Sequence, residues 1–476
     1  MEYENNHKEL WVSPEVSKGA GTFDDPYTLR QALERVQPGN AIILKHGSYK
    51  GDMTIQCSGT IDKPIRIVAQ QNATVQIQKG CWYFYDTSDL IVSGLHFHNA
   101  PSSAVALMGA CTRNNFQSLT FLNCGSLEKA SSTFFIGGAG GQCNVIEHCS
   151  FTRGQSPRVS VEQPITVAIM IAEGDQDQED GLIRDHVLRY NLIQDYDCGI
   201  MVGTRGTGME QFGHVVENNV LRNCALDGIK VNCGDTEVRG NTILDCGNRG
   251  IWVATGTASS IEDNRLERCF TGIQVISAGH IIQNNCVVDS MKQAVHVNGI
   301  VEESDVPRST IIIEQNSLIQ IEDQPCGEVA ITGVLMDDHS SCVMRRNLIF
   351  GRCDPYVITG KTGLTRRDAT VSVIQENVVS GAARCDEKEG CAFEEITFRD
   401  PDKRDFQTAS ACGARGWIAA ADTLQVLNVK PGEGAPEILS EEELTEVERL
   451  ITDVDKQEAA KRSLFSSDDE ENYEEE

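Results

Sequence analysis

Short apolar runs separated by Gly, Asn and Asp recur along the middle of the chain at a fixed period. In four consecutive copies a short apolar segment returns every 22 residues, at Gly228–Val231, Gly250–Val253, Gly272–Val275 and Ala294–Val297. These copies lack the 3.6-residue period of an amphipathic helix. A fixed period in this range is typical of stacked supersecondary units that bury their apolar faces against one another. The pattern therefore predicts an all-β chain folded as a right-handed parallel β-helix, a solenoid with about 22 residues per coil.

Two other columns of the repeat are expected to build the solenoid. One is an asparagine column, whose members are Asn219, Asn241, Asn264 and Asn285. The other, about five residues later, holds small core residues, which are Cys224, Cys246, Cys269 and Ser290. Asn tolerates left-handed backbone at coil corners, and stacked amides hydrogen-bond along a β-stack. Coils stacked about 4.8 Å apart hold their Cβ atoms slightly too far apart for disulfides, so we expect a ladder of free thiols.

The rest of the chain divides around this solenoid. Residues 1–40 are expected to form an N-terminal strand and a capping helix that begins at Asp25-Pro26. Residues 41–407 are predicted to be the β-helix, with loop insertions in 101–215 and a closing strand pair near 393–407. Residues 408–436 are interpreted as a linker, and 437–476 as an acidic tail.

The tail has its own pattern. Ser440 and Glu443 form a capping box, and an apolar stripe follows on one helical face, formed by Leu444, Val447, Ile451 and Val454. The last eleven residues, SSDDEENYEEE, are too charged to fold alone. We expect an amphipathic helix and a disordered end, which either cap the solenoid or recruit a protein partner.

Charge and composition narrow the partners. The net charge is −29, and the tail contributes −12 of it. An acidic body argues against a nucleic-acid partner, because neutralisation of phosphates supplies most of that affinity. The chain has no apolar run long enough to span a membrane, and its start lacks the basic and apolar regions of a secretion signal. We therefore expect no membrane partner and a cytoplasmic location, or an extracellular one if a leader has been removed. The many unpaired cysteines favour a reducing compartment.

A set of motifs spread over about 400 residues carries a family resemblance. They are Trp11–Pro14, Asp25–Tyr27, Pro38–Leu44, Gly47–Tyr49, Leu90–Phe97 and Val216–Asn219. In these motifs the chain resembles the chondroitinase B and alginate lyase family. The resemblance implies β-elimination on a uronate-containing polysaccharide: a divalent cation, usually Ca²⁺, neutralises the uronate carboxylate, a Lys removes the C5 proton and an Arg assists at the leaving oxygen.

The residues at the family's catalytic turns differ in this chain. In the family the Lys lies in an Asn-Lys-Ser turn, one coil before an Arg-His-Gly. The matching turns here read Val231-Asn232-Cys233-Gly234 and Trp252-Val253-Ala254-Thr255-Gly256. The acidic pair expected just before the Lys turn is reduced to Asp227.

Strand alternation points to a different set of candidates. If Ile229 and Val231 face the core, Lys230 faces outward. The outward column then holds Lys230, Trp252, Gln274 and His296. This strip of about 15 Å would place a basic group, an aromatic platform, an amide and an imidazole in line for a sugar chain. The alternative is that the insertions in 101–215 simply cover this face.

Roles for these and nearby residues follow. The catalytic candidates are Lys230, Arg249 and His296; as the alternative, Lys230 is a solvated surface charge. The substrate-binding candidates are Trp252, Gln274, Asn232 and Arg205, the last in a Gly-rich loop that could equally be a flexible connector. The candidate Ca²⁺ ligands are Asp175, Asp177, Glu179 and Asp227; the first three form an acidic loop that departs from the EF-hand pattern and could equally be a solvated surface loop.

Two functions are therefore carried forward. The first is a carbohydrate-active, polysaccharide lyase-like β-helix protein acting on a uronate-containing polymer. The second is a non-catalytic β-solenoid whose acidic C-terminal tail recruits a partner.

Overall fold

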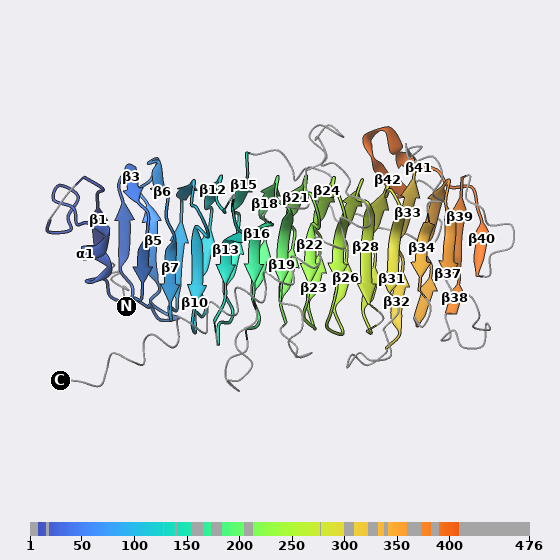
Figure 1. The fold of residues 1–476 in the computed structure, drawn as a ribbon, viewed down its shortest axis with the longest axis horizontal. Helices are drawn as coiled ribbons and strands as arrows, with labels where there is room; N and C mark the ends of the chain where they lie inside the picture. Colours follow the sequence, from blue (N-terminus) through green and yellow to red (C-terminus); the bar gives the residue numbers. More distant parts are fainter. Residues whose placement is uncertain are drawn as a thin grey trace, which may run out of the picture.

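The computed structural model describes residues 8–15, 19–126, 128–138, 140–154, 165–172, 183–203, 213–276, 278–298, 309–321, 332–337, 341–358, 373–381 and 390–408. Within these ranges the chain is a long solenoid of short strands, with a single α-helix, α1 (Leu29–Leu33), and a 3-10 helix, η1 (Pro401–Lys403). Three parallel sheets run along it from end to end (Figure 1). The predicted parallel β-helix is confirmed.

We name the sheets in the order in which each coil visits them. Sheet A has 14 strands in this spatial order: β1 (Glu9–Val12), β2 (Ala41–Leu44), β5 (Ile65–Ala69), β8 (Leu90–Ser93), β11 (Asn115–Gln117), β14 (Val145–Glu147), β17 (Val187–Arg189), β20 (Val215–Glu217), β23 (Glu237–Arg239), β26 (Ser260–Glu262), β29 (Ile281–Gln283), β32 (Ile311–Glu314), β35 (Cys342–Arg345) and β38 (Val373–Gln375).

Sheet B also has 14 strands: β3 (Gly47–Lys50), β6 (Val75–Gln78), β9 (Leu95–His98), β12 (Thr120–Leu122), β15 (Ser150–Thr152), β18 (Leu192–Gln194), β21 (Val220–Arg222), β24 (Thr242–Leu244), β27 (Arg265–Glu267), β30 (Cys286–Val288), β33 (Ser317–Gln320), β36 (Leu348–Gly351), β39 (Asn377–Ser380) and β40 (Cys391–Phe393).

Sheet C has 12 strands: β4 (Met53–Ile55), β7 (Trp82–Tyr85), β10 (Val105–Met108), β13 (Ser131–Ile136), β16 (Thr166–Ile171), β19 (Cys198–Val202), β22 (Ile229–Val231), β25 (Arg249–Val253), β28 (Thr271–Ile276), β31 (Gln293–Asn298), β34 (Thr332–Met336) and β37 (Asp354–Ile358). The inward side chains of the three sheets meet in one continuous apolar core.

Helix α1 closes the N-terminal end, as expected, but it begins later than Asp25. Its N-cap is Thr28, which forms a capping box with Gln31. Asp25 instead accepts backbone hydrogen bonds from a tight turn at residues 20–22, and Tyr27 pairs with Trp11. These contacts hold residues 25–27 extended, so the helix starts only after them.

The asparagine column is a continuous hydrogen-bonded ladder at the corner between sheets A and B. Its members are Asn191, Asn219, Asn241, Asn264, Asn285, Asn316, Asn347 and Asn377. Each side-chain Nδ2 donates to the Oδ1 of the next asparagine at 3.0 Å. The left-handed residue is the one before the ladder position, for example Asn218 with φ of 54°. The ladder was predicted correctly, but the left-handed backbone was assigned to the wrong residue.

The cysteine column is buried in the core, as predicted, and the fifteen cysteines among the described residues are free thiols. Hydrogen bonds with Cys224 and Cys269 raise the pKa of Cys246 well above its ordinary value, and burial adds to this. These thiols stay protonated and act as small core residues.

The described chain ends in an antiparallel pair, β41 (Phe398–Asp400) and β42 (Asp405–Thr408), the closing strand pair expected near 393–407. The pair lies over sheet B beside β33 rather than at the end of the solenoid (Figure 1). Phe398 and Phe406 pack on the outer side of sheet B, and Arg404 contacts Glu267 at 2.8 Å and Asp289 at 3.4 Å.

Among the described residues, no helix is long and apolar enough to cross a membrane.

Candidate functional site

The predicted outward column on sheet C is present. The strands pair Lys230 with Trp252, Trp252 with Gln274, and Gln274 with His296. The flanking residues Ile229 and Val231 belong to the core. Alternation therefore assigned the four side chains to the correct side of the sheet.

The expected exposure of this column is wrong for its first two members. Lys230 is 1% exposed and Trp252 is 7% exposed, whereas Gln274 and His296 are half-buried. The outward positions of earlier coils are also buried, and they form a second apolar cluster that includes Ala106, Phe135, Met170 and Met201. This part of the outer face is buried, so Lys230 is not a solvated surface charge.

Two cations contact the Trp252 ring. Nζ of Lys230 lies 4.6 Å from the ring centroid and Cζ of Arg249 lies 3.7 Å from it. Such contacts are worth about 0.5–2 kcal/mol, with the larger value for a desolvated pair. Arg249 also lies 3.6 Å from Asp227, whose carboxylate accepts the backbone N–H of Arg249 at 3.2 Å. The structure therefore brings together four residues that the sequence places on two neighbouring coils.

A polar line continues from this cluster toward the more open coils. Nε of Arg249 donates to Oε1 of Gln274, and Nε2 of Gln274 donates to Asn298 at 2.7 Å. His296 pairs through Nε2 with Oδ1 of Asp337 at 3.2 Å. The side chains of His296 and Asp337 are 18% and 34% exposed, so this pair, on the strand beside Gln274, is more accessible than Lys230 and Trp252.

Two of these residues were missed by the sequence reasoning. Asn298 lies two positions beyond His296, and Asp337 lies 41 positions beyond it. Because this coil is much longer than 22 residues, the repeat gives no signal that Asp337 returns beside His296.

Asn232 is too buried in the structure to contact a ligand. It is 2% exposed, and its Nδ2 donates to the Gly203 carbonyl at 3.0 Å, so it braces neighbouring coils. Cys233, where the family resemblance would place the catalytic Lys, is a buried free thiol 3.4 Å from the Thr236 hydroxyl. This position therefore carries a thiol in place of the amine that the resemblance implies.

Four of the predicted residues, Asp175, Asp177, Glu179 and Arg205, lie outside the described residues. The remaining candidate Ca²⁺ ligand, Asp227, does not fit that role, because it is 1% exposed and faces Arg249. The part of the chain that is described holds no group of three His, Cys, Asp or Glu residues arranged for a metal.

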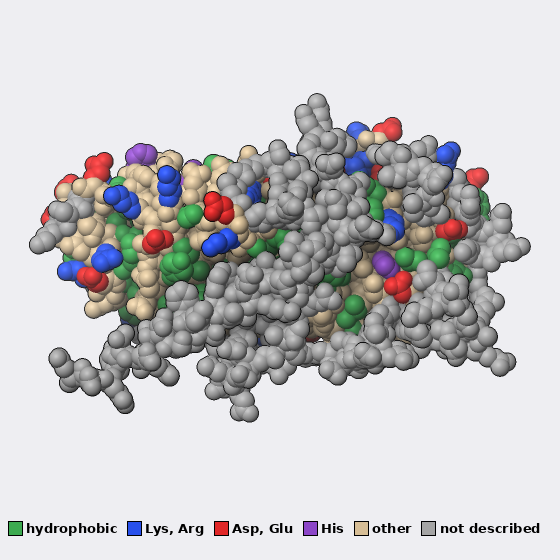
Figure 2. Space-filling model, in the orientation of Figure 1, with side chains coloured by type: hydrophobic (Ala, Val, Ile, Leu, Met, Phe, Trp, Pro, Cys, Tyr) green, Lys and Arg blue, Asp and Glu red, His purple; other side chains and the backbone are tan. Residues whose placement is uncertain are grey.

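Charged side chains of both signs are mixed on the visible face of the protein (Figure 2). On the face shown in Figure 2, the described Lys and Arg side chains are interspersed with Asp and Glu, without a continuous basic band. A polyanion would therefore have to be held by specific groups such as Arg249, since the net charge of −29 repels it.

Comparison with known proteins places the fold. Residues 168–363 match a family model described as a right handed beta helix region. None of the curated proteins matches the chain in sequence.

Solved structures extend the likeness over most of the chain. AlyGC, an alginate lyase of polysaccharide lyase family 6, superposes with a TM-score of 0.65 at 18% identity, covering 87% of this chain and 57% of its own. A mannuronic acid specific lyase of family 6 from human gut microbiota gives 0.59 at 16% identity, covering 83% and 93%. The family 6 lyase Pedsa3628 from Pseudopedobacter saltans gives 0.58 at 15% identity, covering 78% and 93%.

The chain has the fold of these lyases. It spans just over half the length of AlyGC. At these identities the likeness concerns the fold, and the chemistry has to be argued from the residues of sheet C.

Proposed function

We propose that this chain binds a uronate-containing polysaccharide along the outer face of sheet C and cleaves it by β-elimination. The observation that carries the proposal is the polar line from the Lys230–Trp252–Arg249 cluster to Gln274, whose strand partner is His296 of the His296–Asp337 pair. It combines positive charge for a uronate carboxylate with a group able to take a proton. The family 6 lyases of the same fold, which include alginate lyases, support this substrate class.

His296 is the general base in this proposal. With Nε2 facing Asp337, Nδ1 is left to accept the proton α to the uronate carboxylate. The electron pair forms the new carbon–carbon double bond, the glycosidic carbon–oxygen bond breaks, and a water proton passes to the leaving oxygen. Asp337 orients the imidazole and stabilises its charged form.

Lys230 and Arg249 act on the electrostatic potential of the site. Both side chains are buried, and a low dielectric strengthens their attraction to negative charge. They therefore stabilise the bound substrate carboxylate and the negative charge that develops in the transition state. Gln274, which is half-buried beside them, makes the direct contact to the sugar. Asp227 is not used as a calcium ligand in this scheme, because it faces Arg249.

The experiment is an elimination assay on a panel of uronate polymers, followed by the ultraviolet absorbance of the unsaturated product. His296→Gln should lower the rate by about 10²- to 10⁴-fold, the usual contribution of a general base. His98→Gln is the matched control, because His98 is a half-buried histidine on the outer side of sheet B. Equal rates for the two variants would remove His296 from the mechanism.

A second candidate function is favoured by the burial of Lys230 and by the thiol at Cys233. In it the solenoid is a non-catalytic platform whose acidic C-terminal tail recruits a protein partner. Wild-type protein that cleaves none of the polymers, yet binds a partner that a chain ending at 436 does not bind, would favour this function.

A further inference from the structure

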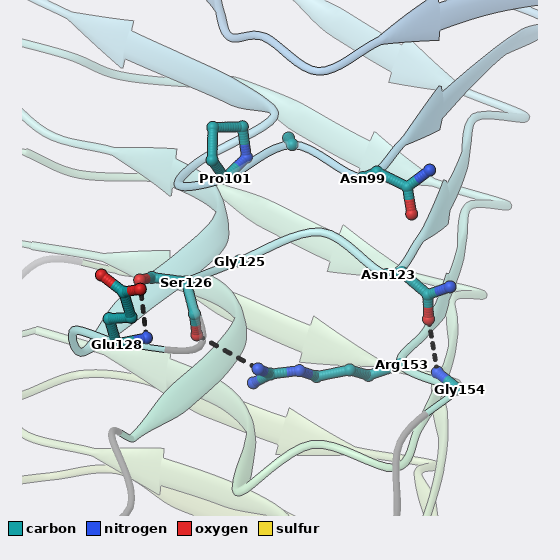
Figure 3. A pocket seen from close by; sticks show the side chains of 9 residues that line it. Asn99, Pro101, Asn123, Gly125, Ser126, Glu128, Arg153 and Gly154 are labelled. Carbon is teal, nitrogen blue, oxygen red and sulfur yellow. Dashed lines mark hydrogen bonds between the residues drawn. The ribbon is translucent and has the colours of Figure 1, made fainter.

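A cavity of about 560 Å³ opens at the corner between sheets B and C, away from the cluster on sheet C. It is bounded by three successive coils, at the residues that follow β9, β12 and β15. Its size is in the range of small-molecule sites. Its lining is polar, with a guanidinium, two side-chain amides and a carboxylate (Figure 3).

Arg153 lies across the floor of this cavity (Figure 3). Its Nη2 donates to the Ser126 carbonyl at 3.1 Å. Among the described residues no carboxylate forms an ion pair with Arg153. Burial lowers the pKa of Arg153, and the nearby Asp197 opposes this shift. Asp197, however, accepts hydrogen bonds from the backbone N–H and hydroxyl of Thr166. The cavity therefore holds a half-buried cation whose remaining N–H groups can still receive an anion.

The loop that accepts Arg153 is held in place. The Ser126 N–H donates to the Ser131 hydroxyl at 2.7 Å, and the Ser126 hydroxyl accepts the N–H groups of Glu128 and Lys129. This turn fixes the carbonyl that orients the guanidinium. A fixed planar guanidinium suits bidentate binding of a carboxylate.

The other walls suit hydroxyl groups. Asn99 and Asn123, with left-handed backbones at φ of 55° and 52°, present their amides from neighbouring coils on one side. Asn123 uses Oδ1 to accept the Gly154 N–H at 2.8 Å, which leaves its Nδ2 to donate. On the opposite side lies the exposed carboxylate of Glu128, an acceptor for hydroxyl donors.

We propose that this cavity is a second, non-catalytic binding site for a carboxylate-bearing sugar, with the carboxylate on Arg153 and the hydroxyls on the amides and Glu128. The geometry carries the proposal by itself, since none of these groups belongs to the cluster on sheet C. A free uronate and the end of a uronate polymer both carry the carboxylate and hydroxyl groups that this site would bind, and the test separates them.

The test titrates glucuronate, an oligouronate and glucose into the full chain by calorimetry. Wild type should bind glucuronate if the natural ligand is a free uronate, or only the oligouronate if it is a polymer end. Glucose should bind at least about tenfold more weakly than the acidic ligand. Arg153→Gln should weaken glucuronate by about tenfold or more. If only the oligouronate binds, the variant should lose one of two binding events, because the outer face of sheet C accounts for the other. Lys129→Gln, on the same loop but outside the cavity lining, should bind the acidic ligand as wild type does.

Some results would overturn the proposal. These are equal binding of glucose and both acidic ligands, no binding of either acidic ligand by wild type, or an Arg153→Gln variant that is folded by circular dichroism and binds as wild type does. An equal loss in Lys129→Gln would also do so, because it would show a general disturbance of the loop. Elimination activity retained in Arg153→Gln separates this site from the one on sheet C.

Discussion

The asparagine ladder gives the most exacting prediction about stability. Asn264 is 0% exposed. Its Oδ1 accepts two N–H groups of Asn241, and its Nδ2 donates to Val238 at 2.8 Å and to Asn285 at 3.0 Å. Asn264→Asp keeps the shape but replaces the donor by an oxygen that faces two acceptors. That oxygen has to carry a proton for the ladder to persist.

The cost follows from the pKa of an ordinary aspartate. Holding a group of pKa about 3.9 protonated at pH 7 costs about 4 kcal/mol, at about 1.4 kcal/mol per pH unit. The hydroxyl serves only one of the two acceptors, which adds about 1 kcal/mol. Because the folded-state pKa is raised, the loss grows as pH rises above the unfolded value. We expect about 5 kcal/mol at pH 7 and about 2 kcal/mol at pH 4.5.

The assay is urea unfolding followed by far-ultraviolet circular dichroism at the two pH values. Asn218→Asp is the matched control, because Asn218 is exposed and its left-handed backbone tolerates Asp. It should change the free energy of unfolding by less than about 0.5 kcal/mol. A loss in Asn264→Asp that is the same at both pH values would refute the reasoning.

Three further predictions concern other parts of the solenoid. Burial lowers the pKa of His186 from 6.5 to about 3. The free energy of unfolding should therefore fall as pH drops below 6.5, by up to about 1.4 kcal/mol per pH unit. His186→Asn should reduce that slope, measured by urea unfolding. Gly250→Ala should lower the thermal midpoint and cost about 1–3 kcal/mol, because its Cβ would lie 2.4 Å from a Leu266 carbon. Gly141→Ala is the control, since its Cβ would meet nothing closer than 3.6 Å. Equal midpoints for the two variants would contradict this. Arg404→Ala leaves the buried Glu267 with fewer partners, so hydrogen exchange in 398–408 should become faster; unchanged exchange would show that the two phenylalanines hold the strand pair without it.

The solenoid could be predicted because its columns repeat. A 22-residue period fixes which side chains stack, so the asparagine and cysteine columns and the outward position of Lys230 follow from spacing alone. The start of α1 was missed because Asp25 serves a tertiary turn that no local signal reveals.

The site could be predicted only in part. Alternation tells which side of a sheet a residue occupies but not what lies against it, so the sequence left open whether Lys230 is exposed or buried. Asp337 and Arg153 were missed because coils of irregular length bring them into place. Periodicity gives no register for such coils.

The central claim is that acidic polysaccharide binds the outer face of sheet C around Trp252. The most direct measurement is tryptophan fluorescence during titration with an oligouronate, in wild type and in Trp252→Phe. We predict a saturable change in wild type that disappears in the variant. An unchanged signal in wild type, or the same change in Trp252→Phe, would contradict the claim.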